Sequence, residues 1–425
     1  MKMLIISTLC GLSLLLADAV HAYPIDAAAE TGIQRLEGYR QAQINKVYGK
    51  LLPKGARLSI DQIHLRLQDK PSMTLPPVDA GFTRQVVKLL NDLSEGKADR
   101  FGIAVLDLTD RDHPVYAEHR AEARFSPGSV GKLGIVMGVF AALANAWPDD
   151  ITQRQRVLRD SIVTADAFIG HDHHTVPIWD GERLYSHKIR LGDQANLWSY
   201  LDWMLSASSN AAASMVAKQM MLLSRFGRAY PVSHAQEQAL FNNTPRSQLG
   251  HLLTRAFEDG LAASGIDANG FRQGKFFSGY GKRQIPGLPS YATPRELMRF
   301  LLHLEQGKVV DSWSSLEIKR LLYITQRRIR YASSPALDHA AVYFKSGSFY
   351  RCKPEAGFHC RKYKGNDLNL LNSVAIVESP AGDPDGLFYM VVITSNLLKK
   401  NAAVLHQSVG TYLHRLIEQR HAVAR

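Results

Sequence analysis

Five polar residues in three short motifs could together support the attack of a serine hydroxyl on an acyl group. The motifs follow one another along the chain as S-V-G-K, S-S-N and K-S-G, and their reactive members are Ser129, Lys132, Ser208, Asn210 and Lys345. A serine hydroxyl is a weak nucleophile at neutral pH, so it needs a neighbouring base, a path for its proton and donors for the developing oxyanion. The three motifs contain groups for each of these tasks.

The surroundings of Ser129 distinguish it from Ser94, which begins a second S-x-x-K string. Ser94 and Lys97 lie at the polar end of a helical stretch, where a helix more often stops than starts. Ser129 instead follows a loop with helix-start signals and precedes an apolar run, so we expect it at the N-terminus of a buried helix. Lys132 is three residues further on and therefore lies on the same face, within reach of the hydroxyl.

This ordered set of motifs resembles that of the penicillin-recognising serine hydrolases, namely the class A β-lactamases and the low-molecular-mass D,D-peptidases, which carry S-x-x-K, S-[DSG]-N and K-[TS]-G. The similarity covers roughly residues 85–420. It implies an α/β (α+β) fold, in which an antiparallel sheet is flanked by helices and an all-α subdomain is inserted. The catalytic domain would span residues 81–420, with its α/β part at 81–122 and 310–420 and its helical part at 123–305.

The resemblance also implies a role for each of the five residues. Ser129 would be the nucleophile and Lys132 the base or proton relay, because an amine buried beside a second ammonium group has a lowered pKa. Ser208 would carry a proton to the leaving nitrogen, and Asn210 would hold the substrate amide and fix Lys132. Lys345 lies on an alternating strand-like run, where a buried lysine is costly unless paired or functional. It would attract a substrate carboxylate and tune Ser208.

The three residues after Lys345 would complete the substrate site. Ser346 replaces the commoner threonine of the third motif and keeps a hydroxyl for the carboxylate. Gly347 would let a ligand backbone approach the strand edge closely. By correspondence with the family, the backbone N–H groups of Ser129 and Ser348 would form the oxyanion hole. No cofactor and no metal ion are expected.

The base for deacylation is the point at which the chain departs from class A β-lactamases. Those enzymes carry a glutamate after the second motif, in an E-x-x-L-N setting, that activates the deacylating water. The nearest string here begins at Glu237 and has one extra residue before its asparagine. Glu237 is therefore a candidate deacylation base, or else an exposed glutamate on a helix. Without such a base, an acyl-enzyme formed from a β-lactam would turn over slowly.

A second departure is the long segment between the first two motifs, which contains His171, Asp172, His173 and His174 in succession. These residue types can bind metals, but the downstream partners of a metallohydrolase are missing, so we expect a solvent-exposed loop. Such a loop could border the cleft and alter which substrates fit. Arg351, beyond the third motif, could assist with a substrate carboxylate or could be a surface charge.

The parts of the chain outside the motifs are typical of an exported protein, either periplasmic or extracellular. Residues 1–22 have the basic, apolar and small-residue regions of a signal peptide. Residues 23–80 form an N-terminal extension whose apolar content is too thin for a separate core. Signal removal would leave Cys352 and Cys360, which could form a disulfide in an oxidising compartment or act as a redox or metal pair.

Composition limits the partners of the protein. The net charge of +12 suits general solubility or attraction to anionic wall polymers and lipid headgroups, and the chain has no nucleic-acid-binding motif. No membrane span is expected once the signal is removed, because the apolar run near the N-terminus is short. We expect a monomer.

These observations leave two classes of function. The first is an exported serine hydrolase resembling class A β-lactamases, which acts on β-lactams or on peptidoglycan-type D-amino-acid peptides; a D,D-carboxypeptidase or esterase with poor β-lactam turnover is a variant of it. The second is a non-turnover penicillin-recognising module that binds the cell wall through the same cleft. The presence of both lysines together with Ser129, Ser208 and Asn210 favours the enzyme, because a binder needs no proton path.

Overall fold

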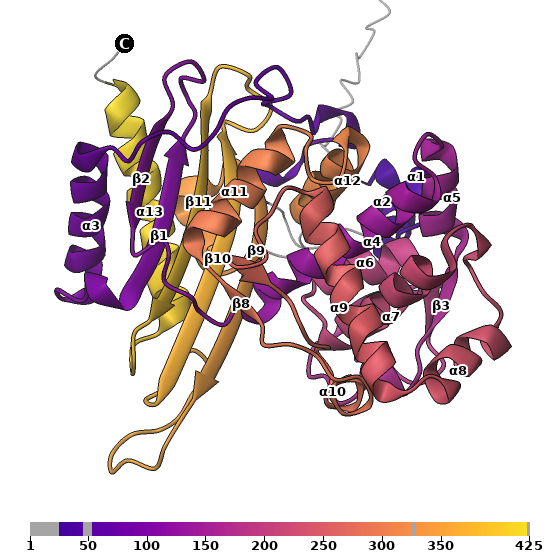
Figure 1. Cartoon of the computed structure of the whole chain (residues 1–425). Coiled ribbons are helices and arrows are strands. Elements are labelled where there is room, and N and C mark those ends of the chain that lie inside the picture. The colour runs from indigo at the N-terminus through magenta and orange to yellow at the C-terminus, as the bar shows by residue number, and fades with distance from the viewer. Residues whose placement is uncertain (1–24, 46–52, 325–327, 423–425) are drawn as a thin grey trace, which may run out of the picture.

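The computed structural model describes residues 25–45, 53–324 and 328–422, so the predicted signal peptide at residues 1–22 lies outside the described residues. In Figure 1 a sheet region and a helical region lie side by side. The combination of an antiparallel sheet with packed helices confirms the expected α+β class.

A five-stranded antiparallel sheet, in the order β2-β1-β11-β10-β9, forms the first region. Its strands are β1 (Phe101–Asp107), β2 (Val115–His119), β9 (Ala341–Arg351), β10 (Leu368–Ser379) and β11 (Leu387–Asn396). Strand β1 shows that both faces are covered, since Ile103 and Val105 join one hydrophobic cluster whereas Ala104 and Leu106 join another. Because successive side chains of a strand point to opposite faces, one strand contributes to two cores.

Two helices from opposite ends of the chain cover one face of the sheet. They are α3 (Ala80–Ser94) and α13 (Ala402–Ala422), which pack against each other (Figure 1). Leu90 on α3 and Val409 on α13 are fully buried in the same cluster. Ser94 is the last residue of α3, and its hydroxyl donates to the carbonyl of Leu90. The second S-x-x-K string therefore ends a helix, as predicted.

The helical region is built around α4 (Lys132–Ala146), which is buried over most of its length. The other helices are α5 (Ile151–Asp160), α6 (Leu197–Leu205), α7 (Asn210–Phe226), α8 (His234–Asn243), α9 (Arg246–Ala263), α10 (Gly279–Gln284), α11 (Pro294–Glu305) and α12 (Ser312–Tyr323). Helices α7 and α9 pack on α4, and α11 and α12 lie against the second face of the sheet. The close approach of α9 depends on glycine, because a Cβ at Gly260 would lie 2.5 Å from the backbone nitrogen of Gly138.

One helical segment in the described part of the chain, Gly128–Ala146, is long and apolar enough to cross a membrane, but 83% of it is buried inside the protein. Its apolar surface is therefore used by the core of the helical region.

The segment that precedes the sheet packs on the helical region. Its helices are α1 (Ala27–Thr31) and α2 (Gln34–Ile44). Ile33 is fully buried in the larger cluster, and Arg35 makes a bidentate ion pair with Asp202, with N–O distances of 2.7 and 2.8 Å.

Six short strands form three two-stranded sheets: β3 (Ile162–Thr164) with β6 (Gln194–Asn196), β4 (Val176–Trp179) with β5 (Leu184–His187), and β7 (Phe271–Arg272) with β8 (Tyr291–Ala292). The 3-10 turns are η1 (Lys54–Ala56), η2 (Ile60–Gln62), η3 (Ala98–Arg100), η4 (Gly128–Gly131), η5 (Ala167–Ile169), η6 (Gly227–Ala229), η7 (Arg330–Ser333) and η8 (Pro335–Leu337).

Candidate active site

The turn η4 places Ser129 where the helical region meets the sheet. It continues directly into α4, so the first motif begins a buried helix, as expected. The turn lies against Gly347 of β9, at which a Cβ would be 2.5 Å from the carbonyl oxygen of Pro127 and 2.7 Å from the nitrogen of Ser129. Glycine is therefore required at position 347 so that β9 can approach the turn that carries Ser129. We had expected the same glycine to admit a ligand backbone.

Lys132 lies at the centre of the three motifs. Its Nζ is 3.1 Å from the hydroxyl oxygen of Ser129, and it donates to Asn210 Oδ1 at 2.9 Å and to the carbonyl oxygen of Ser208 at 2.7 Å. The residue is fully buried. Burial lowers the pKa of Lys132 to about 7; the carboxylate of Asp172 opposes this shift, and the charge of Arg330 adds to it. A substantial fraction of this amine is therefore neutral at physiological pH and able to accept a proton.

Ser208 connects the two lysines. Its Oγ is 3.4 Å from Lys132 Nζ and accepts a hydrogen bond of 2.9 Å from Lys345 Nζ. The backbone of Ser208 has φ +59°, in the left-handed region, which turns the chain sharply before α7. Burial, followed by the charges of Lys132 and Arg330, holds the pKa of Lys345 well below its usual range. The four polar groups form a continuous path from the Ser129 hydroxyl to Lys345.

The second motif is held in place by Asp172, whose side chain is 4% exposed. Its Oδ2 accepts hydrogen bonds from Ser209 Oγ at 2.8 Å, from the backbone nitrogen of Asn210 at 2.7 Å and from that of Ala211 at 3.0 Å. These donors include the first free N–H groups of α7, where a negative charge is favoured. Burial alone would raise the pKa of Asp172, but hydrogen bonds from His174, Ala211 and Ser209 hold it well below its usual range.

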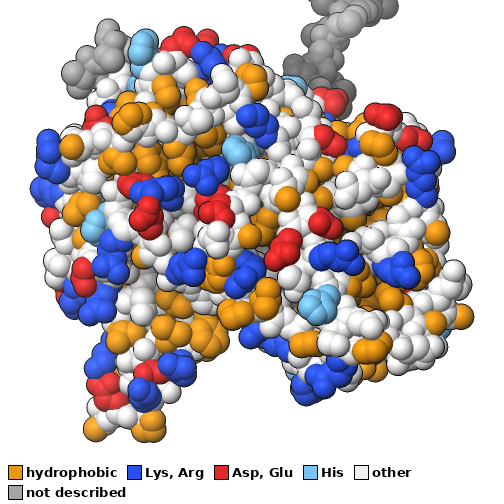
Figure 2. Space-filling view, in the orientation of Figure 1, with side chains coloured by type: hydrophobic (Ala, Val, Ile, Leu, Met, Phe, Trp, Pro, Cys, Tyr) orange, Lys and Arg blue, Asp and Glu red, His pale blue; other side chains and the backbone are white. Residues whose placement is uncertain are grey.

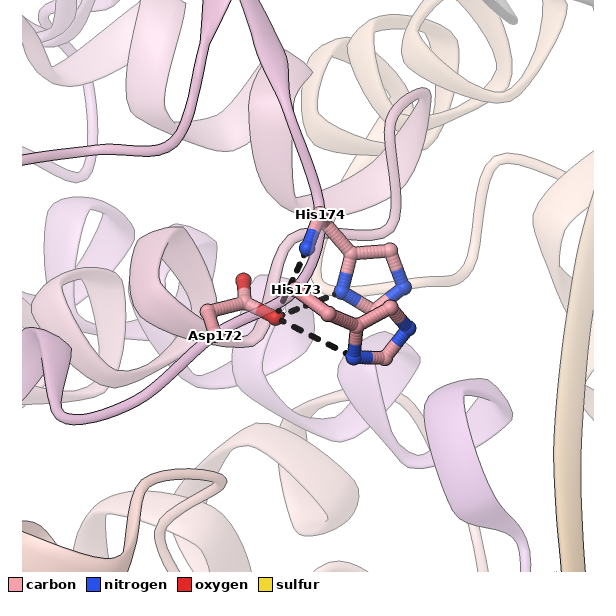
Figure 3. Close-up of side chains that lie close together, drawn as sticks. All are labelled: Asp172, His173 and His174. Atoms are coloured by element: carbon pink, nitrogen blue, oxygen red, sulfur yellow. Dashed lines mark hydrogen bonds and ion pairs between the residues drawn. The ribbon is translucent and has the colours of Figure 1, made fainter.

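The expectation of a solvent-exposed loop at residues 171–174 is therefore wrong for Asp172. Figure 3 shows Asp172 with His173 and His174 beside it. His174 Nδ1 is 2.6 Å from Asp172 Oδ1, whereas His173 Nδ1 is 3.9 Å from that atom and its side chain is 70% exposed. Potential ligand atoms of the three residues lie within 4.8 Å of one another, so the three side chains could together bind a metal ion. Both oxygens of Asp172, however, already accept hydrogen bonds from the protein.

A cavity of about 330 Å³ opens beside the motifs and is lined by their polar side chains. Of the predicted site residues, it is lined by Ser129, Ser208, Asn210, Lys345, Ser346 and Ser348. Arg330, Lys362, His173 and His174 also line it, and no aspartate or glutamate of the described residues does. The cavity is therefore suited to an anionic ligand.

Arg330 lines the cavity, and the sequence motifs did not reveal it. Its guanidinium donates to Ser346 Oγ at 2.7 Å, to Ser348 Oγ at 3.1 Å and to the hydroxyl of Tyr363 at 3.0 Å. Within the described ranges it has no carboxylate at ion-pair distance, and its buried Nε–H has no hydrogen-bond partner. Arg351, the residue that we had considered for a substrate carboxylate, instead pairs with Asp367 and is 63% exposed.

The connection between β9 and β10 brings Tyr363 and Lys362 to the cavity. It projects from the sheet and carries hydrophobic, basic and acidic side chains (Figures 1 and 2). Cys352 and Cys360 are joined by a disulfide within it. The structure therefore contains the disulfide, and not a free redox or metal-binding pair of cysteines.

Glu237 is the predicted site residue that the structure does not bring to the others. It lies on α8, forms an ion pair with Lys218 of α7 and does not line the cavity. Lys218 also pairs with Asp166. Because Lys218 is eight residues beyond Asn210 on the same helix, it lies roughly 12 Å from the end of α7 that faces Ser129. The carboxylate of Glu237 thus neutralises a buried lysine.

A comparison with models of protein families finds one match. A family model described as the beta-lactamase enzyme family matches residues 84–415. No curated protein matches the chain. Among solved structures, a protein named PBP-A is 14% identical over 81% of this chain and 100% of its own, with a TM-score of 0.49. A β-lactamase from Sphaerobacter thermophilus is 15% identical over 80% of this chain and 97% of its own, with a TM-score of 0.48. A β-lactamase from Burkholderia phymatum is 16% identical over 80% and 100%, with a TM-score of 0.49.

Proposed function

Because the chain belongs to the β-lactamase enzyme family, we propose that it is an exported serine hydrolase that is acylated on Ser129. The observation that carries the proposal is the 3.1 Å approach of Lys132 Nζ to the Ser129 hydroxyl. A buried amine with a pKa of about 7 is matched to proton transfer near neutral pH. The resemblance of the motifs and the family membership support the same chemistry.

In the proposed acylation, Ser129 Oγ attacks the carbonyl carbon of the substrate while Lys132 accepts the hydroxyl proton. The backbone N–H groups of Ser129 and Ser348 would stabilise the oxyanion that develops. Ser208, 2.9 Å from Lys345 Nζ, would pass a proton to the leaving nitrogen as the carbon–nitrogen bond breaks. The protonated form of Lys132 would resupply that proton through Ser208, at 3.4 Å.

The cavity suggests that the substrate carries a carboxylate. Lys345, Arg330 and Ser346 lie together at one side of it, without an acidic neighbour among the residues that the structure describes. A guanidinium that lacks a carboxylate partner is well suited to bind one from a ligand. β-Lactams and D-amino-acid peptides of peptidoglycan type both carry a carboxylate close to the bond that would be cleaved.

No carboxylate among the described residues lines the cavity, so no acidic group is in place there to activate the deacylating water. Slow deacylation is what the alternative functions predict. A D,D-peptidase-like enzyme or a penicillin-recognising wall-binding module would form the acyl-enzyme and release it slowly. Both alternatives share the acylation step with a β-lactamase, so the fate of the adduct separates them.

The decisive experiment is the intact mass of the mature protein after exposure to penicillin G, together with its rate of nitrocefin hydrolysis. We expect one penicilloyl adduct per chain or rapid hydrolysis, and neither in Ser129→Ala. Ser94→Ala is the matched control, because Ser94 begins the other S-x-x-K string and ends helix α3. If the unmodified protein forms no adduct and hydrolyses no nitrocefin, a β-lactam substrate is refuted.

A further inference from the structure

The acyl-enzyme needs a base to activate water, and the structure leaves that position without a carboxylate. The carboxylate of Glu237 forms an ion pair with Lys218, and no aspartate or glutamate of the described residues lines the cavity. Of the side chains that do line it, His174 is a neutral-pH base that the acylation steps above do not use. The question is whether its geometry suits the task.

The ring of His174 is fixed by Asp172. The distance from Nδ1 to Asp172 Oδ1 is 2.6 Å, and the backbone nitrogen of His174 also donates to that oxygen, at 3.2 Å. A deprotonated carboxylate accepts only, so Nδ1 carries the hydrogen and Nε2 carries the lone pair. Figure 3 shows the second ring nitrogen of His174 turned away from Asp172. Asp172 thereby sets both the tautomer and the orientation of the ring.

The same carboxylate links His174 to the catalytic residues. Asp172 Oδ2 accepts from Ser209 and from the backbone of Asn210, whose side chain contacts Lys132. The imidazole is thus held by the group that positions the second motif. His173, the neighbouring histidine, lacks this support because its Nδ1 is 3.9 Å from Asp172 Oδ1 and its side chain is largely exposed.

The charged groups around His174 act in opposite directions. Burial and the charges of Lys132 on α4 and of His173 lower the pKa of His174, while the hydrogen bond and the charge of Asp172 raise it. The net direction is downward from the ordinary value of 6.5. The imidazole is therefore neutral at pH 7 and able to accept a proton.

Resting on the proposed function, we propose that His174 is the general base for deacylation and that Asp172 is its positioning residue. A water molecule attacks the carbonyl carbon of the Ser129 ester while His174 Nε2 takes one of its protons. The tetrahedral intermediate then breaks its bond between carbon and Ser129 Oγ, and Oγ receives a proton from the imidazolium. The products are the free serine hydroxyl and the carboxylic acid, so one water is consumed and both catalytic groups are restored.

The test compares His174→Gln with His171→Gln, an exposed histidine of the same segment that does not line the cavity. Acylation and deacylation by penicillin G are measured separately, from the rise and the decay of the adduct mass. We expect His174→Gln to acylate at the rate of the unmodified protein and to deacylate at least about 10²-fold more slowly. His171→Gln should match the unmodified protein in both steps.

Two further measurements separate base catalysis from a structural role. Deacylation by the unmodified protein should rise with pH through the pKa of His174, below 6.5, and then level off, and His174→Gln should lack this rise. Added imidazole should accelerate deacylation of His174→Ala. A parallel fall of both steps in His174→Gln would mean that the second motif had been disturbed, and it would overturn the assignment.

The remaining outcomes are equally distinct. Equal deacylation in His174→Gln and the unmodified protein, with acylation intact, overturns the role of His174 and leaves the proposed function standing. Loss of deacylation on treatment with EDTA would mean that Asp172, His173 and His174 hold a metal ion, which also overturns it. Absence of any adduct and any hydrolysis in the unmodified protein refutes a β-lactam substrate, and with it the role of His174 in releasing a penicilloyl group.

Discussion

The protein buries lysines in two centres that lie along the same face of β9, and their surroundings are opposite. Lys319 of α12 is fully buried against Tyr343 and contacts the carboxylates of Glu305 at 2.6 Å and Glu378 at 2.7 Å. Lys345 follows Tyr343 by two residues on β9 and has no carboxylate at ion-pair distance among the described residues. Its Nζ donates to the hydroxyl oxygen of Ser208 and to the carbonyl oxygen of Ser346.

Under the proposed function, the difference separates a structural lysine from a reactive one. Removal of a buried lysine that has two carboxylate partners leaves those carboxylates unpaired. A buried amine with neutral partners is less stable when charged, which lowers its pKa and makes it a proton acceptor. Lys132 and Lys345 have the second environment. Lys218, with Asp166 and Glu237, has the first.

The largest effect is expected from Lys132→Met. Removal of the proton acceptor should slow acylation of Ser129 by roughly 10²- to 10⁴-fold. Stability should not fall, because methionine has a similar volume and no charge to desolvate. Adduct formation with penicillin and chemical denaturation together measure this. A variant that lost stability but acylated normally would place Lys132 with the structural lysines.

Lys319→Met should show the reverse pattern. Two carboxylates would remain buried without their cation, and we expect a loss of about 3–5 kcal/mol of unfolding free energy. The folded fraction should still acylate at Ser129. The control is the triple variant Lys319→Met/Glu305→Gln/Glu378→Gln, denatured alongside Lys319→Met. Its neutral amides should restore part of the lost unfolding free energy. An unchanged denaturation midpoint in Lys319→Met would contradict the comparison.

Arg330→Gln sharpens the comparison on the substrate side. A charge-assisted hydrogen bond to a ligand carboxylate contributes about 1.5–3 kcal/mol, so acylation by penicillin at low concentration should slow by roughly 10- to 150-fold. Arg351→Gln is the matched control, because that exposed arginine already pairs with Asp367. The second-order acylation rate measures the effect. Equal rates in the two variants would remove Arg330 from the substrate site.

The sequence predicted those parts of the site whose geometry is local. Ser129 and Lys132 are three residues apart on one helical turn, so their contact follows from chain geometry alone. Arg330 and Asp172 meet the motifs across the fold, from a 3-10 turn and from an irregular loop, and no spacing rule reports such contacts. The prediction for Glu237 failed in the opposite way. Its local sequence resembles that of a catalytic glutamate, but its carboxylate is paired with Lys218 and does not line the cavity.

The fold was predictable for a related reason. Helix α3 is amphipathic and the central strands are apolar runs, and the family resemblance supplied their order. Helix α3 begins at Ala80, with Asp79 as its N-cap. The packing of residues 25–45 against the helical region depended on contacts such as Arg35 with Asp202, which are 167 residues apart and leave no local pattern.

The smallest effect concerns stability and pH, and it follows from the lowered pKa of Lys132. That pKa is about 7 in the folded protein, whereas an unfolded lysine titrates near ~10.4. Between these values the unfolded chain binds more protons, so Lys132 makes the folded state more stable as pH rises, by at most about 1.4 kcal/mol per pH unit. The lowered pKa of Lys345 acts in the same direction.

Lys132→Met lacks its share of this dependence. Its advantage in stability over the unmodified protein should therefore be greatest at pH 7 and should shrink as pH rises towards 10. Chemical denaturation of the pair at pH 7, 8 and 9 measures the trend. A difference between Lys132→Met and the unmodified protein that stayed constant with pH would mean that Lys132 is charged throughout, and it would remove the lowered pKa from the comparison of the two centres.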